Sequence, residues 1–181
     1  MEDLWSLKAS EISKLYLSNE ISLDEIINSV EERFNQVNPK INAIPESTFE
    51  YARKQAKLLD DNKKNNKPLG CLAGVPVTVK INTDQTGFAS TNGLRLNKSL
   101  IAHKNSTVVD NLEKAGALII GRTNTPAFSI RWFTNNSLHG HTFNPHHKNI
   151  TPGGSSGGAA SATASGIGCI GHGTDIAGSI R

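Results

Sequence analysis

Apolar residues recur at helical spacing near the start of the chain and predict two helices there. The first is modestly amphipathic and covers residues 4–18. The second begins at Ser22, because a serine followed three positions later by Glu25 forms a capping box at a helix N-terminus. Its apolar positions continue until Asn38 and Pro39, where the proline is expected to end the helix.

The pattern changes after this proline. The short apolar run 41–44 is typical of a strand, and residues 47–59 return to helical spacing. The polar, turn-rich stretch 60–68 predicts a surface loop. Together these segments predict an N-terminal helical part over about residues 1–60.

Three runs of apolar and β-branched residues predict buried strands, at 74–80, 117–121 and 167–171. Between the first two, Ser106 precedes a helical pattern that Gly116 would end. Small residues predict a further helix over 157–165 that packs closely on its surroundings. Helices that alternate with strands through short connections predict an α/β fold, with its core at about residues 70–181.

The composition fits one globular domain. The chain has 181 residues, of which 36% are hydrophobic and 19% charged, and its formal net charge is only +3. Because the basic residues are scattered and no long apolar run occurs, we expect neither a nucleic-acid surface nor a membrane span. Cys71 and Cys169 show no metal-ligand spacing and no disulfide framework, which favours a cytoplasmic protein.

Two glycine-rich turns carry the candidate chemistry: Ser155 and Ser156 lie in the turn 153–158, and Ser179 lies in another. Glycine lets backbone amides approach a ligand closely, so such turns suit a serine nucleophile beside an oxyanion hole. A flexible Gly/Ser linker is the alternative, but the helical and apolar runs that follow argue against it. Because no Gly-x-Ser-x-Gly elbow is present, the candidate base is Lys80, a lysine that burial at a strand end could keep neutral.

Two other kinds of site remain open from the residues alone. Glycine-rich turns that begin helices also bind phosphates, although the common nucleotide-binding patterns are missing from this sequence. The polar segment 135–150 contains His139, His141, His146 and His147, which could ligate a metal. Since no cysteine or acidic residue has fitting spacing, we expect these histidines to face a substrate channel and to bind no metal.

Four motifs in this order resemble the amidase signature family, across nearly the whole chain. They lie at residues 74–80, 121–128, 153–158 and 173–181. The resemblance implies an amidase-signature fold, with a mixed β-sheet core flanked by helices, and an amide-bond hydrolase that needs no cofactor. It also implies a small-molecule amide as the substrate, with no direct nucleic-acid partner and no membrane, and it leaves a homodimer open.

The resemblance further implies a role for each candidate residue. Ser179 matches the nucleophile that forms an acyl-enzyme, Ser155 matches a bridging serine that follows a cis peptide bond, and Lys80 matches the base. Ser156 would steady the lysine. Asp175 is expected to accept hydrogen bonds from turn amides and from the C-terminal arginine. The backbone amides that match the oxyanion hole are those of Ile176, Ala177, Gly178 and Ser179.

The chain also departs from the family pattern. Ile81 stands where an aspartate usually follows the lysine, and Ala177 replaces a common glycine. Family chains continue well beyond the nucleophile, so we expect residues 1–181 to be a single partial domain, incomplete at its C-terminus and without turnover of its own. The alternatives are an inactive remnant, a ligand-binding module with an anion-binding turn, and an A-type amidotransferase subunit.

Overall fold

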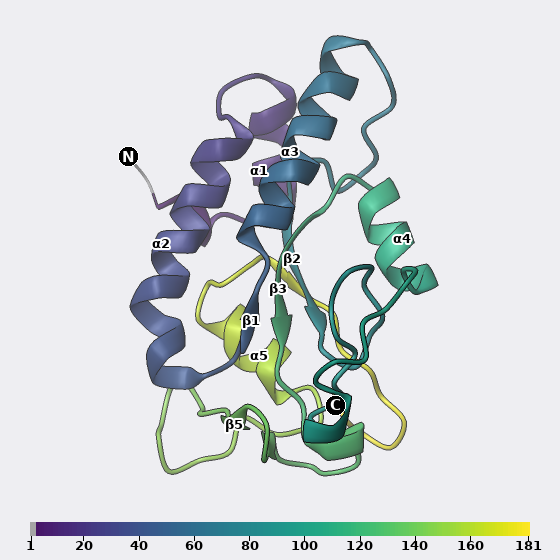
Figure 1. The fold of residues 1–181 in the computed structure, drawn as a ribbon. Coiled ribbons are helices and arrows are strands. Elements are labelled where there is room, and N and C mark those ends of the chain that lie inside the picture. Colours follow the sequence, from purple (N-terminus) through teal and green to yellow (C-terminus); the bar gives the residue numbers. More distant parts are fainter. Residues whose placement is uncertain (1–2) are drawn as a thin grey trace.

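The computed structural model describes residues 3–181. Helices and short strands alternate along this part of the chain, with 3-10 turns (η) between some of them (Figure 1). In chain order the elements are η1 (Leu4–Ser6), α1 (Ala9–Leu17), α2 (Leu23–Ile41), β1 (Glu46–Ser47), α3 (Phe49–Lys64), β2 (Pro76–Lys80), η2 (Arg95–Asn97), α4 (Thr107–Lys114), β3 (Leu118–Thr123), η3 (Ala127–Ser129), β4 (Asn135–Asn136), β5 (Gly140–His141), α5 (Gly157–Ala164) and β6 (Ile170–Gly171).

One mixed sheet forms the centre of the fold, with the strand order β1-β3-β2-β6. β2 runs parallel to β3 and to β6, whereas β1 is antiparallel to β3. α4 lies in the crossover from β2 to β3, as parallel pairing requires. Figure 1 shows the strands between α2 and α3 on one side and α4 on the other. The predicted α/β fold with a mixed sheet and flanking helices is therefore confirmed.

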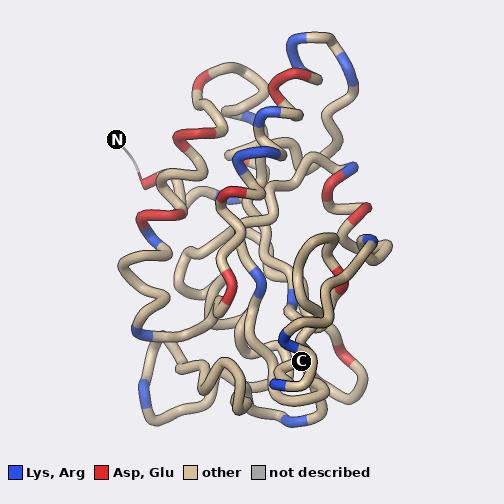
Figure 2. The backbone as a smooth tube through the Cα atoms, in the orientation of Figure 1, with Lys and Arg blue, Asp and Glu red and all other residues tan. Residues whose placement is uncertain are grey.

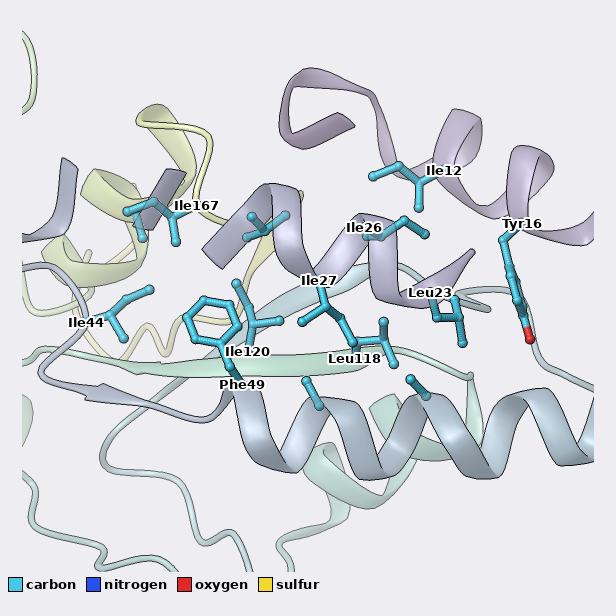
Figure 3. Close-up of a cluster of buried hydrophobic side chains, with 14 of the residues drawn as sticks. Ile12, Tyr16, Leu23, Ile26, Ile27, Ile44, Phe49, Leu118, Ile120 and Ile167 are labelled. Atoms are coloured by element: carbon cyan, nitrogen blue, oxygen red, sulfur yellow. The ribbon is translucent and has the colours of Figure 1, made fainter. Parts of the chain in front are cut away.

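Two hydrophobic clusters hold these layers together. Side chains of α1, α2 and α3 pack on one face of the sheet against Leu118 and Ile120 of β3 (Figure 3). On the other face, Val77 and Val79 of β2 pack with the buried valine of α4. Because successive side chains of a strand point to opposite faces, Lys80 points away from α4 and toward the turn that begins α5.

The first two helices begin largely where the sequence predicts. The helix expected over 4–18 is divided into η1 and α1, because the Glu11 carboxylate accepts a hydrogen bond from the Lys8 amide and begins a new helix there. The capping box of α2 is confirmed: the Ser22 hydroxyl accepts from the Glu25 amide at 3.2 Å, and the Glu25 carboxylate accepts from the Ser22 amide at 2.8 Å.

Helix α2 does not end at Pro39, contrary to the prediction. A proline in the last turn removes a single hydrogen-bond donor, so the helix continues to Ile41 and ends at Asn42, which has a left-handed φ of 48°. The strand predicted over 41–44 is also wrong. The amides of residues 43 and 44 donate to the Asn38 side chain, at 3.0 and 2.9 Å, and the strand β1 begins only after them.

Helix α3 continues to Lys64, so the loop predicted over 60–68 begins later. Contacts with α1 hold the added turn in place. The Tyr16 hydroxyl donates to Asp60 Oδ1 at 3.0 Å, and the Lys63 ammonium lies 4.1 Å from the centroid of the Tyr16 ring. These residues are polar and lack helical apolar spacing, which explains why the sequence pattern did not reveal the extension.

The strands predicted at 74–80 and 117–121 are confirmed as β2 and β3, with slightly shifted bounds. The third predicted strand is much shorter, since only residues 170–171 form β6, and both are half-buried. Ile167 packs instead in the hydrophobic cluster beside α2 and α3. Gly168 separates the two segments with a φ of 86°, a left-handed conformation that interrupts regular strand geometry.

Charged side chains are dispersed over the fold. Figure 2 shows Lys and Arg at separate places along the backbone, alternating with Asp and Glu on the helices. Among residues 3–181, no helix combines the length and the apolar character needed to cross a bilayer.

Gly158, in the first turn of α5, lets this helix approach the end of β3. A Cβ at this position would lie 2.4 Å from the backbone nitrogen of Asn124 and 2.5 Å from its carbonyl oxygen. We expect Gly158→Ala to lower the free energy of unfolding by about 3 kcal/mol in urea denaturation, because backbone atoms cannot rotate away. The control is Ala160→Val on the exposed side of α5, with an expected loss of about 0.6 kcal/mol from helix propensity. Equal losses for both variants would contradict the prediction.

Candidate active site

The Lys80 side chain is fully buried and ends among three hydroxyl groups. Its Nζ lies 2.7 Å from Ser155 Oγ, 3.1 Å from Ser156 Oγ and 2.8 Å from Thr174 Oγ1. Within residues 3–181, no carboxylate lies in ion-pair range of this amine. The structure thus brings together a strand end, a glycine-rich turn and the C-terminal loop around one nitrogen atom.

Burial lowers the pKa of Lys80 to about 8, because an ammonium ion is poorly solvated there. The negative charge of Asp175 acts in the opposite direction but does not cancel this effect. About a tenth of the Lys80 amines are then neutral at pH 7. A neutral amine has a lone pair that can accept a proton from a hydroxyl, so the arrangement suits general-base chemistry.

Backbone geometry fixes the two serines beside the amine. The Gly154–Ser155 peptide bond is cis, which is the conformation that the family resemblance implies. Gly154 has no space for a side chain, since a Cβ would lie 2.6 Å from the backbone nitrogen of Phe133. The Ser156 hydroxyl accepts from the Thr174 amide at 3.2 Å and donates to the Thr174 carbonyl at 3.1 Å. Ser156 therefore connects the glycine turn to the C-terminal loop.

Two amides at the start of α5 have acceptors within the protein. The Ser156 amide donates to the Ser179 carbonyl at 3.1 Å, and the Gly157 amide donates to Thr134 Oγ1 at 3.1 Å. The first of these bonds also attaches the loop of Ser179 to the start of α5.

Asp175 organises the loop that carries Ser179. Its carboxylate accepts hydrogen bonds from the amides of Gly178 at 2.6 Å and Ile180 at 3.2 Å, and forms an ion pair with Arg181 at 3.1 Å. The hydrogen bond from Arg181, followed by those from the two amides, holds the pKa of Asp175 well below its usual range. The predicted hydrogen bonds of Asp175 are therefore confirmed.

The candidate oxyanion amides are not equivalent. The Gly178 amide donates to Asp175 Oδ1 and is therefore engaged within the loop. Across residues 3–181 we find no acceptor for the amides of Ile176, Ala177 and Ser179, nor any hydrogen-bond partner for the Ser179 hydroxyl. Three amides therefore remain available to a ligand.

Thr174 and Asn82 are contacts that the sequence did not indicate. Thr174 belongs to the matched segment 173–181, and its position in that motif was the only signal that could have revealed it. Asn82 Nδ2 lies 3.5 Å from Thr174 Oγ1 and donates to Ser129 Oγ at 3.2 Å. These side chains extend the polar contacts of the lysine to the turn η3.

Ile81, which stands where the family pattern has an aspartate, is fully buried. Its amide donates to the Thr123 carbonyl at 3.0 Å and so continues the pairing of β2 with β3. The partners of the Lys80 amine are neutral hydroxyls, and the Ile81 side chain adds no charge beside it.

The histidine-rich segment does not face the cavity beside Ser179. That cavity has a volume of about 510 Å³ and is lined by the glycine turn, the C-terminal loop and Trp132. His146 and His147 line a separate cavity beside α2, and the other two histidines do not line the first one. The β4–β5 hairpin carries His139 and His141, and none of the four histidines lines this cavity. No group of three metal-ligating side chains occurs in the part of the chain that the structure describes.

Both cysteines are free thiols, and no disulfide joins them. Burial raises the pKa of the Cys169 thiol to about 11. The thiol therefore stays protonated near neutral pH and is a poor nucleophile.

Comparison with known proteins gives one family. The amidase family model matches residues 25–181. The indoleacetamide hydrolase of Bradyrhizobium diazoefficiens is 46% identical over 98% of this chain and 34% of that protein. The A subunit of the glutamyl-tRNA(Gln) amidotransferase of Fusobacterium nucleatum is 39% identical over 99% of this chain and 37% of that protein.

Solved structures of amidases resemble this chain over most of its length. A bacterial aryl acylamidase matches with a TM-score of 0.85 and 34% identity, over 90% of this chain and 34% of its own. Fatty acid amide hydrolase matches with a TM-score of 0.92 and 28% identity, over 98% of this chain and 32% of its own. The chain thus spans about a third of the length of these relatives.

The lowered pKa of Lys80 can be measured directly. We expect a lysine Cε resonance that titrates near pH 8 and is missing from the spectrum of Lys80→Met. The folded pKa lies below the ordinary value near 10.4, so the unfolded chain binds more protons between these two values. The stability of the wild type relative to Lys80→Met should therefore rise as the pH increases through this window. A spectrum in which every lysine titrates near 10.4 would refute the assignment.

Proposed function

The chain belongs to the amidase signature family, and we propose that it forms the N-terminal catalytic part of an amide-bond hydrolase. The observation that carries this proposal is the buried Lys80 amine, which lies 2.7 Å from Ser155 Oγ and has a pKa lowered to about 8. In the proposal Ser179 is the nucleophile, Ser155 transfers the proton and Lys80 is the base.

In the first step Ser179 Oγ attacks the carbonyl carbon of the amide. Its proton passes to Ser155 Oγ while the Ser155 proton passes to the neutral Lys80 amine. The lysine then returns a proton by the same route to the amide nitrogen, whose bond to the carbonyl carbon breaks. The products of this step are a free amine and an ester on Ser179. Water attacks the ester with the same three groups and releases the acid.

This transfer requires the Ser179 hydroxyl to approach Ser155. The backbone supports such an approach. The Ser179 carbonyl accepts a hydrogen bond from the amide of Ser156, which directly follows Ser155 in the sequence. Ser179 is partly exposed on a loop, whereas Ser155 is buried at a helix start. Catalytic hydrogen bonds often shorten only when the substrate binds, and we expect this one to do so.

The developing negative charge on the substrate oxygen needs backbone donors. We assign this role to the amides of Ile176, Ala177 and Ser179, which are not engaged elsewhere within residues 3–181. Asp175 supports them by holding the neighbouring Gly178 and Ile180 amides in place. One such donor is typically worth about 10²–10³ in turnover.

We propose a small-molecule carboxamide with an aryl substituent as the substrate. Trp132 gives the cavity beside Ser179 a flat apolar wall, and the similarity to an indoleacetamide hydrolase supports this class. The similarity to the A subunit of an amidotransferase makes release of ammonia from glutamine the second candidate. We expect hydrolysis of indole-3-acetamide to exceed that of glutamine in the full gene product, measured as ammonia release. Faster glutamine hydrolysis would favour the second candidate.

A fluorophosphonate probe, which modifies activated serines, tests the nucleophile. We expect mass spectrometry to find the probe on Ser179 of the full gene product and no labelling of Ser179→Ala. Lys80→Met should lower the labelling rate by about 10²–10⁴, the usual contribution of a general base. The matched control is Ser165→Ala, which removes a buried serine whose hydroxyl has no partner among the described residues. Labelling of another serine, or unchanged labelling of Lys80→Met, would contradict the proposal.

The pH dependence of labelling follows from the same lysine. Below its pKa of about 8 the amine is protonated and cannot act as a base. The labelling rate should therefore fall about tenfold per pH unit below pH 8 and level off above it. A rate independent of pH between about 6 and 9 would mean that no group with this pKa takes part.

A further inference from the structure

The backbone amide of Lys80 lies where the pairing between β2 and β6 ends. Along this edge the Cys169 amide donates to the Pro76 carbonyl at 2.9 Å, and the His172 amide donates to the Thr78 carbonyl at 2.8 Å. In a regular parallel ladder, the next acceptor for β2 would be the backbone carbonyl of residue 172. The Lys80 amide instead donates to the imidazole Nδ1 of His172, at 3.4 Å.

We propose that His172 is a positioning residue for Lys80: its imidazole replaces the missing strand carbonyl and holds the last residue of β2 in the register that directs the amine to Ser155. This inference rests on the function proposed above. Lys80 is fully buried, so its amide has no access to water as an alternative acceptor. An error of about 1 Å in the position of a catalytic group can cost a hundredfold in rate, so a backbone bond at this residue matters to the chemistry.

Only a neutral imidazole can accept this bond. Because Nδ1 is the acceptor, the ring proton of neutral His172 is assigned to Nε2. Burial, and to a smaller extent the charge of Lys80, lower the pKa of His172 below its ordinary value, which favours the neutral ring. Of the charged side chains on neighbouring segments, Asp175 pairs with Arg181, and Arg122 of β3 pairs with Glu46 of β1. α5, which packs on β2 and β6, carries no titratable side chain.

Protonation of His172 acts on Lys80 in two ways. A proton on Nδ1 removes the acceptor of the Lys80 amide. The new positive charge also repels the Lys80 ammonium. Both changes occur as the pH falls, below the range in which the amine itself becomes protonated. The labelling rate of Ser179 should then fall more steeply than tenfold per pH unit, since two protons are bound instead of one.

Asparagine and glutamine at position 172 give a sharp test. The Oδ1 of asparagine occupies the place of Nδ1 and can accept from the Lys80 amide, whereas glutamine places its amide near the position of Nε2. We expect His172→Asn to keep the fluorophosphonate labelling rate of Ser179 within about threefold of wild type, and His172→Gln to lose roughly tenfold or more, as for a buried amide without an acceptor. Rates would be measured from about pH 5 to 9.

The pH profile separates positioning from a general loss of structure. His172→Asn cannot be protonated, so its rate should fall about tenfold per unit at low pH, without the steeper second phase of the wild type. The matched control is His139→Asn, a half-buried histidine whose pKa is also lowered by burial and which does not contact Lys80. This control should keep the wild-type profile. Equal rates for the asparagine and glutamine variants, or a second phase that persists in His172→Asn, would overturn the inference.

The hydrogen bond between the Lys80 amide and His172 can be followed by NMR, without any measurement of Ser179 labelling. In the ¹⁵N spectrum, the Lys80 amide resonance should shift with the titration of His172 and exchange faster with solvent in His172→Gln than in His172→Asn. If the wild type is not labelled at Ser179 but this coupling is present, the hydrolase proposal fails and the contact stands. If Ser179 is labelled but the Lys80 amide does not respond to His172, the positioning role alone fails.

Discussion

The structure depends on the burial of one lysine amine among neutral hydroxyls. An ammonium ion in such a place lacks both water and a carboxylate, and the pKa of Lys80 falls to about 8 as a result. The surrounding fold therefore favours a state of the amine that is reactive near neutral pH. Ser155, Ser156 and Thr174 solvate this state with hydroxyls, which can act either as donors or as acceptors when the proton moves.

Close backbone packing is what makes this burial possible. Gly154 and Gly158 each lie where a Cβ would meet backbone atoms, so the glycine turn and α5 can approach the end of the sheet. The C-terminal loop is then fastened to the same point through the Ser156 amide and the Ser179 carbonyl. Small residues thus act here through the distances they permit between backbone segments, more than through flexibility.

The C-terminal loop has a different physical character from the lysine site. Asp175 and Arg181 form an ion pair whose arginine is largely exposed, and salt and solvent weaken such pairs. The order of this loop comes mainly from the hydrogen bonds that the Gly178 and Ile180 amides donate to the Asp175 carboxylate. The amine is therefore set rigidly in the core, whereas the proposed nucleophile lies on a segment that can adjust to a substrate.

The sequence by itself determined the fold class, the capping box of α2, the strands β2 and β3, and the motifs that contain Lys80, Ser155, Ser156, Asp175 and Ser179. It could do so because periodicity, caps and glycine turns are local properties. It failed where a side-chain contact overrides the apolar pattern: α3 is extended by contacts with the distant Tyr16 of α1, and the nearby Asn38 side chain binds the amides of the predicted strand. The tertiary structure alone decided that Thr174 and His172 contact Lys80, that Gly178 is occupied, and that the loop histidines lie away from the cavity. The contacts to Lys80 join segments more than 90 residues apart, which no local spacing encodes, whereas the Gly178 contact depends on the conformation of one loop.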